Sequence, residues 1–142
     1  MITTYKDTRR LPYALHDMRA NHITIDGDFL RFEFENGFCV SNEPYEEAKG
    51  TLTITGIDWD FAHIYLLSEY GKEGAFSGRK MALPDFLKEY KNYTLEILDD
   101  CYHGYNVIFD GYLYQPGTEV CLEYHLSLWH DGEMIFETMP YI

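Results

Sequence analysis

Positive charge is the first thing that this sequence lacks. No lysine or arginine follows Lys91, and the 51 residues beyond it contain nine aspartates or glutamates. The whole chain has a formal net charge of −13. A surface of one negative sign repels the phosphates of nucleic acids and of anionic membranes, whereas it attracts cationic partners or metal ions. We therefore expect no nucleic-acid or membrane partner and consider a basic protein partner, although such a charge can also serve solubility alone.

Cysteines and long apolar runs are scarce as well. Cys39, Cys101 and Cys121 are an odd number without the CxxC spacing of structural zinc sites, which indicates reduced thiols rather than a disulfide framework. No apolar run approaches the roughly 18 residues of a membrane span. The N-terminus has no charged-then-apolar pattern of a signal peptide. We therefore expect a cytoplasmic protein.

The sequence also lacks the common catalytic signatures. It contains no HExxH motif, no GxSxG motif and no dinucleotide-binding fingerprint. Cys101 and His103 are two positions apart and could share a strand face, but Asp99 and Asp100 beside them would raise the pKa of a thiol and disfavour a nucleophile. The sequence therefore favours a protein without a cofactor, and a binding role over an enzymatic one.

Apolar and aromatic residues, in contrast, are plentiful. Hydrophobic residues make up 46% of the 142 residues and aromatic residues 17%, with 13 tyrosines. This composition is far from that of a disordered chain, and a chain of this length can bury a sizeable core without disulfides. We expect a single β-rich domain over residues 1–142. The tyrosines suit either the outer faces of a sheet or a ligand groove.

Two long alternating runs, residues 104–114 and 118–129, dominate the last third of the chain. Apolar residues occupy every second position in both runs, which is the pattern of half-buried strands. If Gln115 pairs with Thr118 across the intervening turn, every apolar position meets another one. The predicted pairs are Leu113 with Val120, Phe109 with Tyr124, Val107 with Leu126 and Tyr105 with Leu128.

The remaining elements are mostly predicted strands. Alternating residues flank the hairpin signal Asp26-Gly27, and further strands are expected at residues 51–57, 61–67, 93–98 and 133–138. The loop at 130–132 would fold the last strand back on the preceding one, with Leu128 opposite Met134 and Leu126 opposite Phe136.

One segment, residues 84–91, has the signals of a short helix. It begins with Pro84, carries Asp85 in its first turn and has lysines toward its end. Together with the strands, it predicts a mainly β protein, an antiparallel β-sandwich or barrel of about eight to ten strands with one short α-helix. The choice between sandwich and barrel stays open.

The predicted register places polar side chains together on the outer face of the central hairpin. It sets Asp110 opposite Glu123, Tyr112 opposite Cys121 and Ile108 opposite His125, and the last turn brings Glu137 opposite His125. Two carboxylates facing each other are destabilising unless a metal ion or a shared proton holds them. His125 would then be a ligand or base, oriented by Glu137. The alternatives are a solvated strand face or a bulge at Gly111 that separates the acids.

A short N-terminal pattern adds a resemblance. Leu15-His16-Asp17 stands just before the first alternating strand, which begins near Ile23. This resembles the opening of small acidic bacterial proteins, including immunity-type proteins of toxin systems and domains of unknown function. The resemblance covers about the first 35 residues and implies a small β-rich protein whose role is binding. We expect a structural role for His16 and Asp17, which could tie the N-terminal segment to the sheet.

Three functional hypotheses follow. The first is a binding protein of the immunity type, which uses an acidic, tyrosine-rich sheet face against a basic partner such as a toxin or nuclease domain. The second is a β-barrel that binds a small molecule in a lumen lined by Tyr and Phe. The third is a metal-dependent enzyme built on Asp110, Glu123 and His125. The predicted binding residues are Asp110, Tyr112, Glu123, His125 and Glu137.

Overall fold

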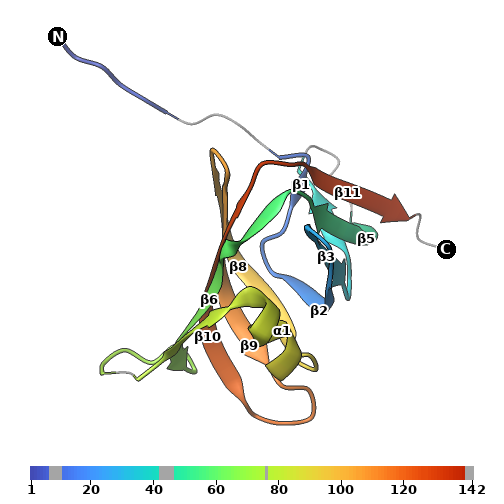
Figure 1. The fold of residues 1–142 in the computed structure, drawn as a ribbon, viewed down its shortest axis with the longest axis vertical. Coiled ribbons are helices and arrows are strands. Elements are labelled where there is room, and N and C mark those ends of the chain that lie inside the picture. Colours follow the sequence, from blue (N-terminus) through green and yellow to red (C-terminus); the bar gives the residue numbers. More distant parts are fainter. Residues whose placement is uncertain (7–10, 42–46, 76, 140–142) are drawn as a thin grey trace.

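A strongly bent antiparallel sheet forms most of the molecule (Figure 1). The computed structural model describes residues 1–6, 11–41, 47–75 and 77–139. The elements are β1 (Tyr13–Ala14), β2 (Met18–Asp26), β3 (Phe29–Phe34), β4 (Phe38–Val40), β5 (Glu47–Ile54), β6 (Ile57–Glu69), β7 (Arg79–Ala82), α1 (Leu83–Glu89), β8 (Thr94–His103), β9 (Asn106–Tyr114), β10 (Cys121–His130) and β11 (Met134–Met139).

The strand order confirms the predicted fold class. Neighbouring strands are antiparallel and follow the order β1-β4-β5-β3-β2-β8-β9-β10-β6-β7, while β11 pairs with β5. The described chain is therefore mainly β with one short helix, as the alternating patterns indicate. In the described residues, the strands at the two ends of this order, β1 and β7, do not pair with each other, so the sheet is not closed into a barrel.

The bend divides the sheet into two layers that enclose the core. Figure 1 shows β2, β3, β5 and β11 on one side, β6, β8, β9 and β10 on the other, and α1 beside the opening between them. Apolar side chains from both layers meet in the middle, where the rings of Phe32 (β3) and Phe109 (β9) lie edge to face at 5.7 Å. Tyr124 is also fully buried, and its hydroxyl donates a hydrogen bond to the carbonyl oxygen of Glu96 at 2.9 Å. The buried hydroxyl thus has a partner, as a close-packed interior requires.

The helix α1 lies within the predicted segment. Pro84 occupies its first turn with Asp85, Lys88 lies in its last turn, and Leu83 and Phe86 are buried. The helix ends at Glu89, two residues earlier than residue 91, and it contacts β2, β6 and β7. Such a short helix is stable only through packing, and this one packs on strands from both layers. No helix of the described residues is long and apolar enough to cross a membrane.

The central hairpin has the predicted faces but a different register. Leu113 pairs with Leu122 and Phe109 with Leu126, so β10 is displaced by two residues from the predicted pairing. The cause is the loop, in which the Gln115 amide donates to the Val120 carbonyl and the Thr118 amide donates to the Gln115 carbonyl. A β-turn at Pro116-Gly117 thus sits inside a longer loop. Because the shift is an even number, the apolar positions remain on the core face.

The predicted pairing of the last strand with its predecessor is wrong. β11 pairs with β5, with Met134 opposite Ile54 and Phe136 opposite Leu52, and neither residue faces β10. The physical reason is that β10 already has a neighbour on each side, β9 and β6, so no edge of β10 is left to accept β11. The chain instead runs through residues 130–132 into the other layer.

β5 and β6 therefore form a two-stranded ribbon with β10 and β11 that passes from one layer to the other. At the crossing, the Asp131 amide donates to the Gly56 carbonyl at 3.0 Å and the Thr55 amide donates to the Glu133 carbonyl at 2.9 Å. The Glu133 amide donates to the Thr55 hydroxyl at 2.8 Å. We call Thr55, Gly56, Asp131 and Gly132 the ribbon junction. It keeps the two chains paired where the sheet changes direction.

The ribbon junction should tolerate a side chain at Gly56 poorly. Gly56 has φ +69°, and an added Cβ would lie 2.4 Å from an Asp131 carboxylate oxygen and 2.6 Å from the Gly132 nitrogen. Gly27 has a similar φ of +61° with nothing within 4 Å, so it is a matched control. We expect Gly27→Ala to lower the free energy of unfolding by about 1–2 kcal/mol, through the backbone conformation alone. Gly56→Ala should lower it by at least about 2 kcal/mol more, because the contact is with backbone. Urea unfolding measures both, and equal losses would contradict the role of the junction.

Candidate functional site

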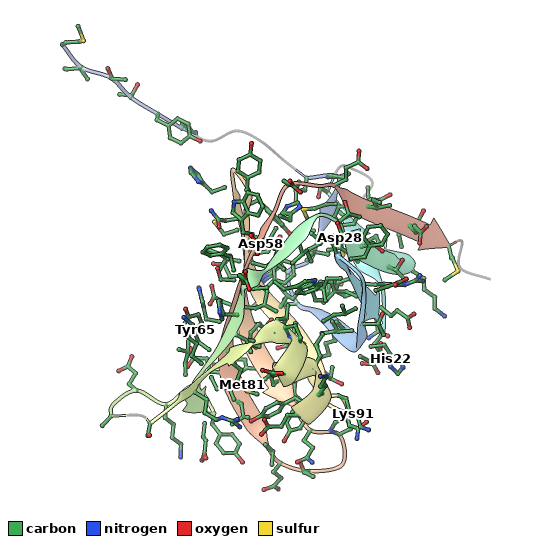
Figure 2. All side chains as sticks on the ribbon, in the orientation of Figure 1. His22, Asp28, Asp58, Tyr65, Met81 and Lys91 are labelled. Atoms are coloured by element: carbon green, nitrogen blue, oxygen red, sulfur yellow. The ribbon has the colours of Figure 1, made fainter. Side chains whose placement is uncertain are left out.

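Two of the predicted site residues lie together on the outer face. Asp110 and His125 are opposite each other in β9 and β10, with Oδ1 and Nδ1 2.6 Å apart. The ring of Tyr65 from β6 lies against His125 with centroids 5.7 Å apart, and Lys80 lies over the Tyr65 ring at 5.5 Å. Tyr65 projects from the outside of the sheet in Figure 2. These four side chains therefore form a partly exposed row in which each contacts the next.

The other predicted residues do not join this pair. Glu123 is opposite Tyr112 rather than Asp110, and it accepts a hydrogen bond of 2.6 Å from the hydroxyl of Ser68. Glu137 lies on β11 and accepts a hydrogen bond of 3.3 Å from Thr51. The two-residue register shift therefore removes the predicted Asp110–Glu123 pair, and the pairing of β11 with β5 removes Glu137 from His125. Among the described residues, no group of three or more His, Cys, Asp or Glu side chains is arranged to hold a metal ion.

His16 and Asp17 lie where the N-terminal segment joins the sheet. His16 Nδ1 donates to the Leu98 carbonyl of β8, and its Nε2 lies 3.3 Å from the Asp17 carboxylate. The Asp17 amide donates to the Ile97 carbonyl at 2.7 Å. Asp17 has φ +63°, a turn conformation that Asp adopts more readily than most residues. These contacts fix the entry of the chain into β2.

An irregular stretch of β6 creates a different site, next to the ribbon junction. Leu128 of β10 pairs with Ala62, but the next residue, Trp129, pairs with Asp58. Residues 59–61 of β6 therefore bulge out of the ladder. The Asp58 carboxylate accepts a hydrogen bond of 3.0 Å from the Asp60 amide and holds the bulge in shape. Bulges of this kind re-aim side chains and are frequent beside functional sites.

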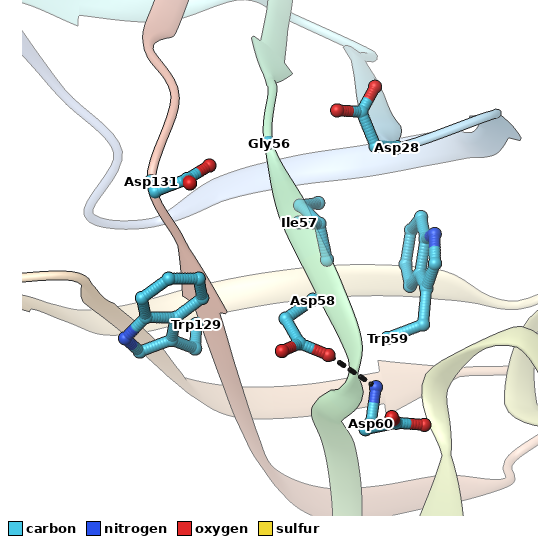
Figure 3. A pocket seen from close by; sticks show the side chains of 8 residues that line it. All are labelled: Asp28, Gly56, Ile57, Asp58, Trp59, Asp60, Trp129 and Asp131. Atoms are coloured by element: carbon cyan, nitrogen blue, oxygen red, sulfur yellow. Dashed lines mark hydrogen bonds between the residues drawn. The ribbon is translucent and has the colours of Figure 1, made fainter.

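The bulge lines an open cleft that we call the tryptophan–aspartate cleft. It encloses about 530 Å³ and is lined by Asp28, Gly56, Ile57, Asp58, Trp59, Asp60, Trp129 and Asp131. In Figure 3, Asp58 points to the Trp129 side of β6, and Trp59 points to the Asp28 side. An adjoining hollow of about 290 Å³ is lined by Asp58, Phe61 and Trp129. The four carboxylates come from three separate segments, the β2–β3 turn, β6 and the strand crossing.

The aromatic walls of the cleft are held in place. The Trp59 indole nitrogen donates to the Gly27 carbonyl at 2.9 Å, which fixes the ring against the β2–β3 turn. The Trp129 ring lies 5.2 Å from the ring of Tyr105, at the tip of the β8–β9 hairpin. Phe61 has no such support and is 64% exposed. A rigid aromatic wall loses little conformational entropy when a ligand covers it.

The cleft is lined by acidic and aromatic side chains. Among the residues that the structure describes, its lining includes four carboxylates and no Lys, Arg or His. Carboxylates form charge-assisted hydrogen bonds with ammonium and guanidinium groups, and tryptophan is the strongest aromatic partner for a cation. Trp129 lies on the same face of β10 as Glu123 and His125, because alternate residues share a face. The cleft thus continues the acidic outer face on which the predicted residues lie.

Sequence reasoning missed this cleft, although one signal for it is present. The apolar residues of β6 that are buried change from an odd position, Ile57, to the even positions Ala62, Ile64 and Leu66. Since a regular strand keeps one parity on one face, the change requires extra residues between Ile57 and Ala62. Those residues include Trp59 and Asp60, and the partners Asp28 and Asp131 become neighbours only through the fold.

Comparison of this chain with known protein families, curated proteins and solved structures finds no match. The site is therefore interpreted from its geometry.

The cysteines are all free thiols, as their spacing predicts, but they differ in environment. Cys101 is exposed, whereas Cys121 is half-buried opposite Tyr114. Burial raises the pKa of the Cys121 thiol, and the nearby Glu96 carboxylate raises it further.

The two thiols should therefore alkylate at different rates. At pH 8 we expect iodoacetamide to modify Cys101 several-fold faster than Cys121, since the thiolate is the reactive form and a raised pKa reduces its fraction. Mass spectrometry of the digested protein measures each site over time. A Cys101→Ser variant should lose the faster reaction and keep the slower one, and equal rates at the two cysteines would contradict this.

Proposed function

We propose that this chain is a non-catalytic binding protein whose tryptophan–aspartate cleft receives cationic side chains of a basic protein partner. The observation that carries the proposal is the cleft lining itself, whose described residues include four carboxylates, two tryptophans and no basic residue. Four carboxylates in one cleft give it a negative potential, so a cationic group would be attracted to it.

The two kinds of lining residue would contribute in different ways. The carboxylates would pair with a guanidinium or ammonium group, and an Asp–Arg pair gains further from bidentate geometry. A cation over a tryptophan face adds roughly 0.5–1 kcal/mol when exposed and about 2 kcal/mol or more when desolvated. Tryptophan is also enriched among the residues that dominate binding energy at protein interfaces. The two tryptophans would therefore supply contact energy, and the carboxylates would supply charge complementarity.

The charge of the whole chain supports the same partner. With a net charge of −13, the protein would steer a basic partner toward its surface before contact and repel acidic competitors. A basic toxin or nuclease domain fits this description, in agreement with the resemblance of the Leu15-His16-Asp17 segment to immunity-type proteins. In that role, the protein acts by covering a basic surface of its target.

The small-molecule alternative has less support. A lumen lined by Tyr and Phe needs space at the centre of the fold, where Phe32, Phe38, Phe109 and Tyr124 are fully buried. The space beneath α1, lined in part by Phe86 and Tyr90, amounts to only about 10 Å³. That is no more than the volume needed for one water molecule.

Tryptophan fluorescence tests the proposal directly, because the chain contains two tryptophans and both line the cleft. We expect a short oligoarginine peptide to change the emission with saturation and to bind more weakly as NaCl rises. The Asp58→Asn/Asp60→Asn variant should weaken binding by at least about tenfold, which corresponds to roughly 1.4 kcal/mol.

The matched control removes the same charge elsewhere. Glu73 and Glu119 are exposed and lie outside the cleft lining, so the Glu73→Gln/Glu119→Gln variant should bind within about twofold of the unchanged protein. Equal weakening by both variants would mean that the peptide is attracted by the overall negative charge and does not bind specifically in the cleft. A flat emission up to millimolar peptide would refute the proposal.

A further inference from the structure

The first six residues form an exposed arm that extends away from the folded body. All six are exposed, with Ile2 92% and Tyr5 81% accessible. Figure 1 shows this segment extending away from the two layers. Its sequence, Ile2-Thr3-Thr4-Tyr5, consists of β-branched and aromatic residues, which are the types enriched in strands. The arm is thus a strand-forming segment without a sheet.

β11 is a strand edge without a neighbour. It pairs with β5 on one side, and no strand of the described residues pairs with its other side. Ile135 and Met139 are 39% and 56% exposed on this strand. Its six residues, Met134–Met139, include no lysine and no proline, the usual protections of an edge, whereas the opposite edge strand β7 carries Arg79 and Lys80.

Charge favours the arm as the occupant of this edge. The first ten residues contain Lys6, Arg9 and Arg10 with only one acid, Asp7, in a chain that is otherwise strongly acidic. β11 and its approach carry Glu133 and Glu137. Two β11 strands paired with each other would bring these glutamates together, which is unfavourable. An uncharged strand-forming segment that is followed by basic residues suits the edge better than a second acidic edge does.

The folded body that follows the arm begins next to β11, whereas the arm itself extends away from it (Figure 1). Tyr13 of β1 packs against Phe136 of β11 with ring centroids 5.0 Å apart. Pro12 restricts Leu11 to extended conformations, which disfavours an immediate reversal onto the same molecule. The arm is therefore better placed to reach another copy.

We propose that residues 2–5 of one molecule add as a strand to the free edge of β11 in a second molecule, and that the exchange is reciprocal. Ile2 and Tyr5 lie on opposite faces of an extended strand, so one of them covers apolar side chains on each face of β11. The reciprocal contact closes a two-fold dimer and leaves no β11 edge open. The proposal goes beyond the proposed function, since the cleft is formed within one molecule.

Sedimentation velocity of the full chain tests the dimer. Because each contact is a short strand, we expect monomer at about 1 μM and a growing dimer fraction toward about 200 μM. Thr3→Pro removes an amide donor and breaks strand pairing, whereas Thr3→Ala keeps the amide. Thr3 is exposed, so neither substitution should alter the fold, and circular dichroism verifies this. The proline variant should raise the dimer dissociation constant at least tenfold, and the alanine variant should leave it within about threefold.

Amide hydrogen exchange separates a second copy from other occupants. Residues 2–5 and the residues of β11 should gain protection together as the concentration rises, and Thr3→Pro should abolish that gain. Protection that is equal at 1 μM and 200 μM would place the arm on its own molecule and overturn the proposal. So would a monomer at every concentration, or a dimer that Thr3→Pro leaves unchanged. The Asp58→Asn/Asp60→Asn variant should dimerise normally, which keeps this test independent of the cleft.

Discussion

The pairing of Thr55-Gly56 with residues 131–133 is the contact on which the architecture depends. Its backbone hydrogen bonds keep two strands together while both change direction, so a single ribbon contributes β5 and β11 to one layer and β6 and β10 to the other. The layers are therefore held together by covalent chain and by hydrogen bonds, in addition to the apolar core. Gly56 and Gly132 permit this approach because each places its backbone where a Cβ would meet the opposite chain.

Local patterns in the sequence determine which side of a strand is buried, and they predict this correctly for the central hairpin. Phe109, Leu113, Leu126 and Leu128 are buried as the alternation indicates. The alternation does not determine the register, because every shift by an even number of residues keeps the same side chains on the core face. The hydrogen bonds of the 115–120 loop select one of these registers. The partner of β11 could not be inferred at all. Its apolar face fits β5 or β10 equally well, and only the occupation of both edges of β10 excludes the latter.

The candidate site shows the same division between local and long-range information. Asp110 and His125 meet because they lie in adjacent strands, so the sequence predicts their vicinity even from a shifted register. The tryptophan–aspartate cleft joins the β2–β3 turn to β6 and to the strand crossing, and no periodicity relates these three segments. Four carboxylates in one cleft have an electrostatic cost where no basic side chain of the described residues lines it. An open, solvated position reduces that cost, since water screens exposed charges.

The partner of β11 also has a consequence for how the chain is made. Met134 pairs with Ile54, roughly 80 residues earlier in the sequence, so the layer built mainly from the first third of the chain lacks its outer strand until the last segment has been synthesised. During that interval, β5 offers an open edge beside β3 on a growing chain. Phe38 of β4 also lacks a packing partner until Phe136 is made, because the two rings pack against each other with centroids 5.5 Å apart. The first layer is thus completed only when the C-terminal strand has been made. A chain that ends before β11 exposes an unpaired edge of β5, which can pair with other chains.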